Sequence, residues 1–107
     1  MKCELGVNET MNIGVSYMSY RLSSSHSLKA KRQAVTFLIS RIHRKFNVSV
    51  TEYGDLDIWQ RITLISCVAS FDPSFPDQLL ERVIDFIAEI RPDLELIECS
   101  TELISGV

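Results

Sequence analysis

Residues 12–46 read NIGVSYMSYRLSSSHSLKAKRQAVTFLISRIHRKF, and the hydrophobic period of this stretch changes partway along it. Residues 12–22 are rich in β-branched and aromatic side chains, which favours a β-strand. After a serine-rich loop over 23–27, apolar residues recur at spacings of three, four and seven positions, which predicts a helix from Leu28 to about Phe46. A strand followed directly by a long amphipathic helix is the opening of a β-α-β unit.

The expected helix begins behind Ser27, whose hydroxyl suits the N-cap position because it can accept a hydrogen bond from a free amide of the first turn. Basic residues in the last turn suit the negative end of the helix dipole. The apolar stripe of the helix consists of Leu28, Val35, Leu38, Ile39, Ile42 and Phe46.

The rest of the chain repeats the alternation of strands and helices. We expect strands at 48–53, 61–70 and 93–104. A second helix is expected with Ser74 as its N-cap, and it ends at Arg91 because Pro92 disfavours helical backbone at the residue before it. The order β-α-β-β-α-β with right-handed crossovers predicts an α+β fold of the ferredoxin-like kind, a four-stranded antiparallel sheet with two helices on one face.

Length and composition indicate the class of protein. The 107 residues suffice for one domain, which we expect over 11–107 behind a flexible extension at 1–10. No run of about 20 apolar residues is present to span a membrane, and the extension does not resemble a secretory signal, so we expect a cytoplasmic protein. The cysteines at 3, 67 and 99 are too widely spaced to predict a disulfide framework or a metal site, and we expect no cofactor.

Charge is unevenly distributed along the chain. Most of the Lys and Arg residues fall between residues 11 and 51, a stretch without Asp or Glu, so all 14 acids lie outside it. The cations of this stretch are Arg21, Lys29, Lys31, Arg32, Arg41, Arg44 and Lys45. A basic segment in a chain of net charge −3 is the strongest indication in the sequence of an anionic partner.

Several of these cations surround the start of the first expected helix, where free amides and the helix dipole favour anions. The leading hypothesis is an RNA- or anion-binding site made of Ser27, Lys29, Lys31, Arg32, Arg41, Arg44 and Lys45, with His26 beside it. The alternative is that Ser27 only caps the helix while the cations form a solvated flank.

Trp59 and Arg61 form an auxiliary candidate at the start of the third strand. An exposed Trp beside an Arg could stack on a base or fill a pocket of a partner. The alternative is that Trp59 closes the end of the core while Arg61 pairs with Asp55 or Asp57.

The face of the sheet opposite the helices is the third candidate. We expect Ile13, Val15 and Tyr17 to share this open face with Ile65 and Cys67. A contiguous apolar patch of this kind would suit a homodimer or another protein partner. The alternative is a scatter of exposed hydrophobic side chains without a partner.

Nucleophilic catalysis would need a serine of the 23–25 run held within hydrogen-bond reach of His26 and Asp57. No nucleophile-elbow pattern accompanies these residues, so we expect no catalytic residues and no enzyme. A small-ligand site at the Ser25–His26 loop is the weakest alternative.

Three motifs resemble one known family. Residues 25–32 read SHSLKAKR, residues 46–50 read FNVSV and residues 59–61 read WQR. In order and spacing they resemble the YlxP-like family of small bacterial proteins of undetermined function, over residues 12–104. The resemblance implies a ferredoxin-like fold and no known catalytic activity. Genes of this family often lie beside genes for translation initiation and ribosome-maturation factors, which implies ribosomal RNA or a ribosome-assembly intermediate as a partner.

The chain departs from the pattern of this family at a few positions. Ala30 stands where an acid is usual, Ile65 and Ser66 replace small residues, and Tyr17 and Ser19 stand where acids are common. The change at Tyr17 and Ser19 makes one face of the sheet less charged, so we expect functions that depend on that surface to differ from those of the family. The sequence therefore predicts a binding module that contacts ribosomal RNA or a ribosomal subunit through its first helix, with protein association or homodimerisation through the open face as the alternative.

Overall fold

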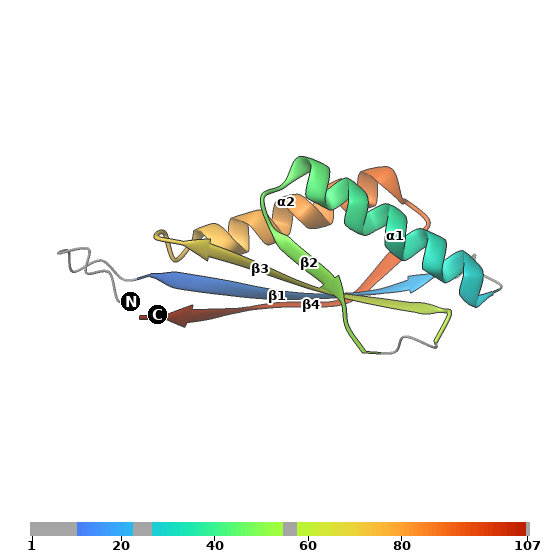
Figure 1. Ribbon diagram of the computed structural model, residues 1–107, viewed down its shortest axis with the longest axis horizontal. Coiled ribbons are helices and arrows are strands. Elements are labelled where there is room, and N and C mark those ends of the chain that lie inside the picture. The colour runs from blue at the N-terminus through green and yellow to red at the C-terminus, as the bar shows by residue number, and fades with distance from the viewer. Residues whose placement is uncertain (1–10, 23–26, 55–57, 107) are drawn as a thin grey trace, which may run out of the picture.

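The computed structural model describes residues 11–22, 27–54 and 58–106. The elements in chain order are β1 (Asn12–Leu22), α1 (Leu28–Lys45), β2 (Ser49–Glu52), β3 (Arg61–Ser70), α2 (Phe75–Ile90) and β4 (Leu94–Ser105). The strands form one sheet in the order β2-β3-β1-β4, and every neighbouring pair is antiparallel. Both helices lie on one face of this sheet (Figure 1). The predicted ferredoxin-like α+β fold is thus confirmed, whereas the predicted extension at 1–10 lies outside the described residues.

The core fills the space between the helices and the sheet. Met18, Tyr20 and Leu22 alternate along β1 toward the helices, and none of them is more than 3% exposed. Ile62 and Leu64 of β3 are fully buried beside them. The helices contribute Ala34, Val35, Leu38, Ile42, Leu79, Leu80, Val83, Phe86 and Ile87. Burying a large apolar side chain of this kind stabilises the fold by about 1.5–3 kcal/mol.

The first turn of α2 packs directly on β1 at Gly14. A Cβ at position 14 would lie 2.3 Å from Cβ and 2.5 Å from Cγ of Pro76. Any side chain at this position would therefore push α2 away from the sheet.

The two helices begin in different ways. Ser27 is the predicted N-cap of α1, and its Oγ accepts a hydrogen bond from the amide of Ala30 at 3.1 Å. Ser74 does not cap α2 as predicted, because its backbone is helical and its side chain makes no cap hydrogen bond. Asp72 replaces it as the acceptor: Oδ1 accepts from the amide of Ser74 at 2.9 Å and from its hydroxyl at 2.7 Å.

A β-bulge sets the faces of β4. Ser19 pairs with Glu98 and the next residue of β1, Tyr20, pairs with Leu96, so Ile97 is an extra residue in the ladder. The bulge allows Glu95 and Glu98, three positions apart, to lie on the same face of the sheet.

Candidate nucleic-acid interface

Lys31 was expected at the surface with the other cations of α1, and the structure places it in the core instead. The side chain is 1% exposed, and its Nζ donates to the carbonyl oxygen of Ile58 at 2.7 Å. It also forms an ion pair with Oε2 of Glu52 at 3.4 Å. Lys31 therefore ties α1 to β2 and to the loop before β3, and it is not available to a phosphate.

Arg32 lies beside Lys31 and shares its partner. The Nη2 of Arg32 donates to both carboxylate oxygens of Glu52 at 2.6 Å, and the Arg32 side chain remains 46% exposed. Glu52, which sequence reasoning did not single out, is thus held by two cations. Its place at the end of β2, directly after the acid-free stretch, is the only signal in the sequence for this role.

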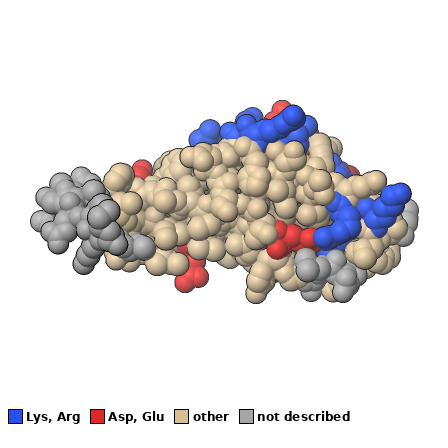
Figure 2. All heavy atoms as spheres, in the orientation of Figure 1, with Lys and Arg blue, Asp and Glu red and all other residues tan. Residues whose placement is uncertain are grey.

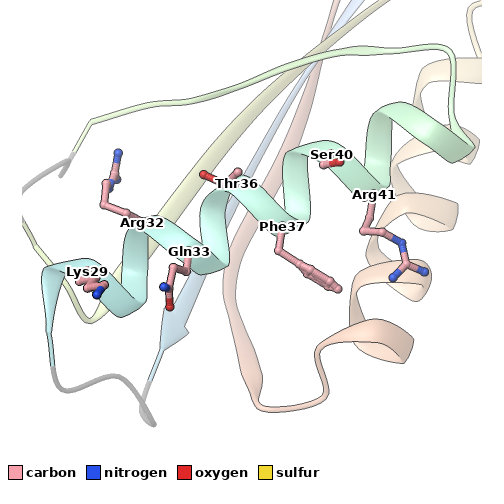
Figure 3. Close-up of a pocket in the computed structure, with 7 residues that line it drawn as sticks. All are labelled: Lys29, Arg32, Gln33, Thr36, Phe37, Ser40 and Arg41. Atoms are coloured by element: carbon pink, nitrogen blue, oxygen red, sulfur yellow. The ribbon is translucent and has the colours of Figure 1, made fainter.

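A shallow groove of about 570 Å³ runs along the outer face of α1. It is lined by Lys29, Arg32, Gln33, Thr36, Phe37, Ser40 and Arg41. Phe37 and Arg41 point toward α2, whereas Arg32 points to the other side of the helix (Figure 3). Three cations and several uncharged hydrogen-bonding side chains meet here, and no carboxylate is among the lining residues.

Four of these lining residues were not among the predicted site residues: Gln33, Thr36, Phe37 and Ser40. Their spacing from Lys29, at about one helical turn per step, places them on the side of α1 that faces away from the core. The helical spacing in the sequence is therefore a signal for these four residues, whereas a search for charged side chains passes over them because they are uncharged.

Aromatic rings hold the cations at the C-terminal end of α1. The guanidinium carbon of Arg41 lies 5.4 Å from the ring centre of Phe37 and 5.8 Å from that of Phe86. The Nζ of Lys45 lies 4.8 Å from the ring centre of Phe86. These are cation–π distances, so the positive groups lie over the rings, while Lys45 remains exposed and Arg41 half-exposed to solvent. Arg44 is exposed, with no such contact to the described residues.

Positive charge gathers over both ends of α1 in the space-filling view (Figure 2). The exposed face of α2 is acidic and carries Asp77, Glu81, Asp85 and Glu89. Within the described parts of the chain, no ion pair joins these acids to the cations of α1. The two helices thus present surfaces of opposite charge on the same side of the molecule.

Trp59 and Arg61 do not join the α1 groove. Trp59 is half-buried, between exposed neighbours. Arg61 lies on the open face of the sheet, where its Nε donates to Oγ of Ser19 at 2.8 Å and its Nη2 pairs with Glu98 at 3.6 Å. The acids at 55 and 57, considered as its partners, lie outside the described residues. The sheet therefore separates Arg61 from α1.

The open face contains the predicted residues and also acidic ones. Ile13, Val15 and Tyr17 are half-buried there, and Tyr17 pairs with Ile65 as expected. A hollow of about 570 Å³ lies on this face, lined by Val15, Tyr17, Tyr53, Ile65, Glu98, Ser100, Thr101 and Glu102. The prediction that this patch is entirely apolar is wrong, because β4 brings the carboxylates of Glu98 and Glu102 to the same face.

Other kinds of site have little support among the described residues. His26 and the serines of the 23–25 run lie outside them. No cluster of metal-ligating side chains is found within 11–22, 27–54 and 58–106. In the same ranges, no helix is long and apolar enough to cross a membrane. The hydroxyl of Tyr20 is buried and has no hydrogen-bond partner among the described residues. Desolvation, with a smaller effect of Cys99, raises the pKa of Tyr20 well above its usual value.

Comparisons with known proteins agree on the relatives of this chain. A family model described as "Protein of unknown function (DUF503)" matches residues 13–101. The "Uncharacterized protein YlxP" of Bacillus subtilis (strain 168) is 32% identical to this chain over 90 residues, which make up 84% of this chain and 97% of that protein.

Two solved structures are similar in shape at low sequence identity. The de novo designed protein Foldit4 has a TM-score of 0.46 and 12% identity, over 87% of this chain and 96% of that one. Protein SO0527 from Shewanella oneidensis has a TM-score of 0.42 and 17% identity, over 92% of each chain.

Proposed function

The chain belongs to the DUF503 family of proteins of unknown function, and from that premise we propose that it is a non-enzymatic binding protein that contacts RNA through the outer face of α1. The observation that carries the proposal is the α1 groove, whose lining combines cations with hydroxyl and amide groups and contains no carboxylate. Contacts of these types to phosphate and sugar position proteins on nucleic acids without reading sequence.

The dimensions of the groove suit a stretch of backbone. Lys29 and Arg41 lie twelve residues apart on one helix, which corresponds to about 18 Å along its axis. Arg44 and Lys45 continue the basic surface beyond Arg41. We therefore assign phosphate contacts to Lys29, Arg41, Arg44 and Lys45, and we leave out Lys31 because it is buried.

Arg32 has a separate role in this proposal. Its side chain is about half exposed, and its nitrogen lies 2.6 Å from both oxygens of Glu52. A phosphate that approaches Arg32 would compete with this carboxylate. Arg32 therefore contributes less to affinity than Lys29, which has no ion pair with any described residue.

Ribosomal RNA is the RNA that we propose as partner, and a salt series tests it. The tagged protein, sedimented with cell lysate, should travel with a ribosomal subunit or its precursor at low salt and be released as salt rises. A protein that stays at the top of the gradient at every salt concentration would contradict ribosome binding.

A binding measurement with purified components tests the site itself. The probe is a fluorescent single-stranded RNA of about 20 nucleotides, long enough to cover the groove. Four phosphate contacts predict a slope of about −3 in a plot of log affinity against log salt. Lys29→Gln with Arg44→Gln should make this slope shallower by about 1.4. Arg21→Gln, a change of one charge on β1 away from α1, is the control and should leave the affinity nearly unchanged.

Homodimerisation through the open face is the second candidate function. The half-buried Val15 and Tyr17 beside the hollow on this face favour it. Sedimentation velocity would show a dimer that Tyr17→Asp converts to a monomer. A parent chain that is already a monomer at high concentration would exclude this candidate and leave RNA binding unaffected.

A further inference from the structure

The strand at one edge of the sheet has an unpaired backbone. β4 (Leu94–Ser105) is 12 residues long and has β1 as its one neighbour in the sheet, so the outward amides and carbonyls of β4 have no strand partner among the described residues. The opposite edge, β2, is only 4 residues long. A long free edge is a template for another strand.

The two faces of β4 differ in chemistry. Glu95, Glu98 and Glu102 pair with residues of β1 that lie on the open face, so all three carboxylates share that face. Leu96 and Leu103 lie on the other face and are 37% and 39% exposed. The strand from Leu94 to Ser105 contains no Lys or Arg.

Two arginines form exposed ion pairs with glutamates of this row, and these pairs are weak. Arg21 pairs with Glu95 at 3.2 Å, and both side chains are more than half exposed. Arg61 pairs with Glu98 at 3.6 Å, where the Glu98 side chain is 61% exposed. Exposed ion pairs of this kind contribute little to stability and exchange readily. Glu102 has no ion pair with a described residue.

The hollow on the open face begins beside this row of carboxylates. Glu98 and Glu102 form one side of it, and the rings of Tyr17 and Tyr53 lie among its other lining residues. A carboxylate beside an aromatic ring is a favourable environment for an ammonium or guanidinium group. The hollow therefore offers room for long cationic side chains that come from a strand beside β4.

We propose that β4 binds an extended peptide segment in which basic and apolar residues alternate, and that this segment adds to the sheet as a fifth strand. Side chains of a strand alternate between faces, so the basic ones meet Glu98 and Glu102 while the apolar ones cover Leu96 and Leu103. This peptide site is separate from the proposed RNA site, because α1 lies on the face of the sheet opposite Glu98 and Glu102.

Charge argues against a second copy of β4 as the occupant. A β4 strand from another copy would bring three more carboxylates to the same edge and no cation to pair with them. Like charges across a strand pair are destabilising. A basic segment from another protein has the complementary charge.

A synthetic peptide of about eight residues with alternating Lys and Val tests the proposal, at a length matched to an ordinary strand. Two control peptides are needed. One has the same composition with all Lys before all Val, and the other is N-methylated at every second amide so that it cannot pair with an edge. Calorimetry measures affinity, and amide hydrogen exchange locates the peptide on the intact chain.

We expect the alternating peptide to bind and to protect the amides of residues 96–104, and each control peptide to bind at least tenfold more weakly. Glu98→Gln with Glu102→Gln should weaken binding by about tenfold, whereas Glu81→Gln with Asp85→Gln on α2 should not change it. Equal binding of all three peptides, or protection outside β4, would overturn the proposal. So would a dimer in which β4 is already protected without peptide. None of these results depends on RNA binding, which Lys29→Gln with Arg44→Gln tests separately.

Discussion

α1 and α2 occupy equivalent places on the sheet, yet only α2 carries the charges that a helix prefers at its start. α2 has Asp77 in its first turn, where the helix dipole stabilises an acid. The first turn of α1 contains no acid, and Lys29 and Lys31 stand there against the dipole. Local helix energetics therefore account for the first turn of α2 but not for that of α1. The two cations in the first turn of α1 need another reason, and the Lys31–Glu52 pair supplies it for one of them.

Lys31→Ala should give the largest effect and would sharpen this contrast. The change empties the space of a buried side chain and takes one of two cations from Glu52, while Arg32 stays paired with it, so we expect a loss of about 2–4 kcal/mol in the free energy of unfolding. Lys29→Ala, two residues away and exposed, should change it by less than about 0.5 kcal/mol. Urea unfolding measures both.

A double replacement checks the cause. Lys31→Met with Glu52→Leu removes both charges, and it should recover most of the stability that Lys31→Ala loses, because an apolar pair needs no partner charges. If the double variant is as unstable as Lys31→Ala, the lost stability comes from the charged contacts of Lys31 themselves, because methionine refills the space that alanine leaves empty.

Gly14→Ala tests how closely α2 approaches the sheet. The new Cβ would overlap with Pro76, so we expect a loss of about 1–3 kcal/mol in thermal or urea unfolding. Gly54→Ala is the matched control: a Cβ there meets nothing within 4 Å, and its φ of 61° costs about 1–2 kcal/mol through backbone strain alone. A loss below about 0.5 kcal/mol for Gly14→Ala would mean that α2 shifts to admit the methyl group at little expense.

Removing the serine at each helix start compares the two caps directly. Ser27→Ala should reduce stability by about 1 kcal/mol, because the amide of Ala30 loses its acceptor. Ser74→Ala should cost only about 0.5 kcal/mol, because it removes an exposed hydrogen bond from the Ser74 hydroxyl to Asp72 while the Ser74 amide keeps the same acceptor. A larger loss of stability for Ser74→Ala than for Ser27→Ala in urea unfolding would contradict this difference between the two caps.

The smallest expected effect is a change with pH in the contribution of Asp72 to the free energy of unfolding. The amide and then the hydroxyl of Ser74 donate to its carboxylate and hold the pKa of Asp72 below its ordinary value of 3.8. A lowered pKa in the folded state means that the contribution is present above pH 3.8 and is lost as pH falls through the folded pKa. The stability difference between the parent and Asp72→Asn should therefore shrink in acid. A difference independent of pH would contradict this role.

The fold was predictable from periodicity, but two details of the site were not. Positions 31, 35, 38 and 42 fall on one helical stripe, so Lys31 belongs to the core row, and its charge led us to expect it at the surface. Its partner Glu52 comes from β2, and a contact between separate elements has no local signal. At the start of α2, Ser74 and Asp72 are both good cap residues by composition, and only the backbone conformation selects between them.

The open face shows a similar limit. Alternation along β1 correctly placed Ile13, Val15 and Tyr17 on one side of the strand. The acids that share this face come from β4, where the bulge at Ile97 shifts the alternation by one residue. A strict period of two would have separated Glu95 from Glu98, so the sequence pattern alone could not reveal the acidic row.

The order of the strands has a consequence for how this chain assembles as it is made. β1 is an inner strand, and its ladder with β4 joins residues that are 72 (Leu22 and Leu94) to 93 (Asn12 and Ser105) positions apart in the sequence. At a synthesis rate of about 5–20 residues per second, β1 waits on the order of 4–19 s for that neighbour. During this interval one flank of an apolar strand is open to any passing chain. The nascent protein therefore keeps an edge that other chains can pair with until its last strand emerges, and chaperone protection matters up to that stage.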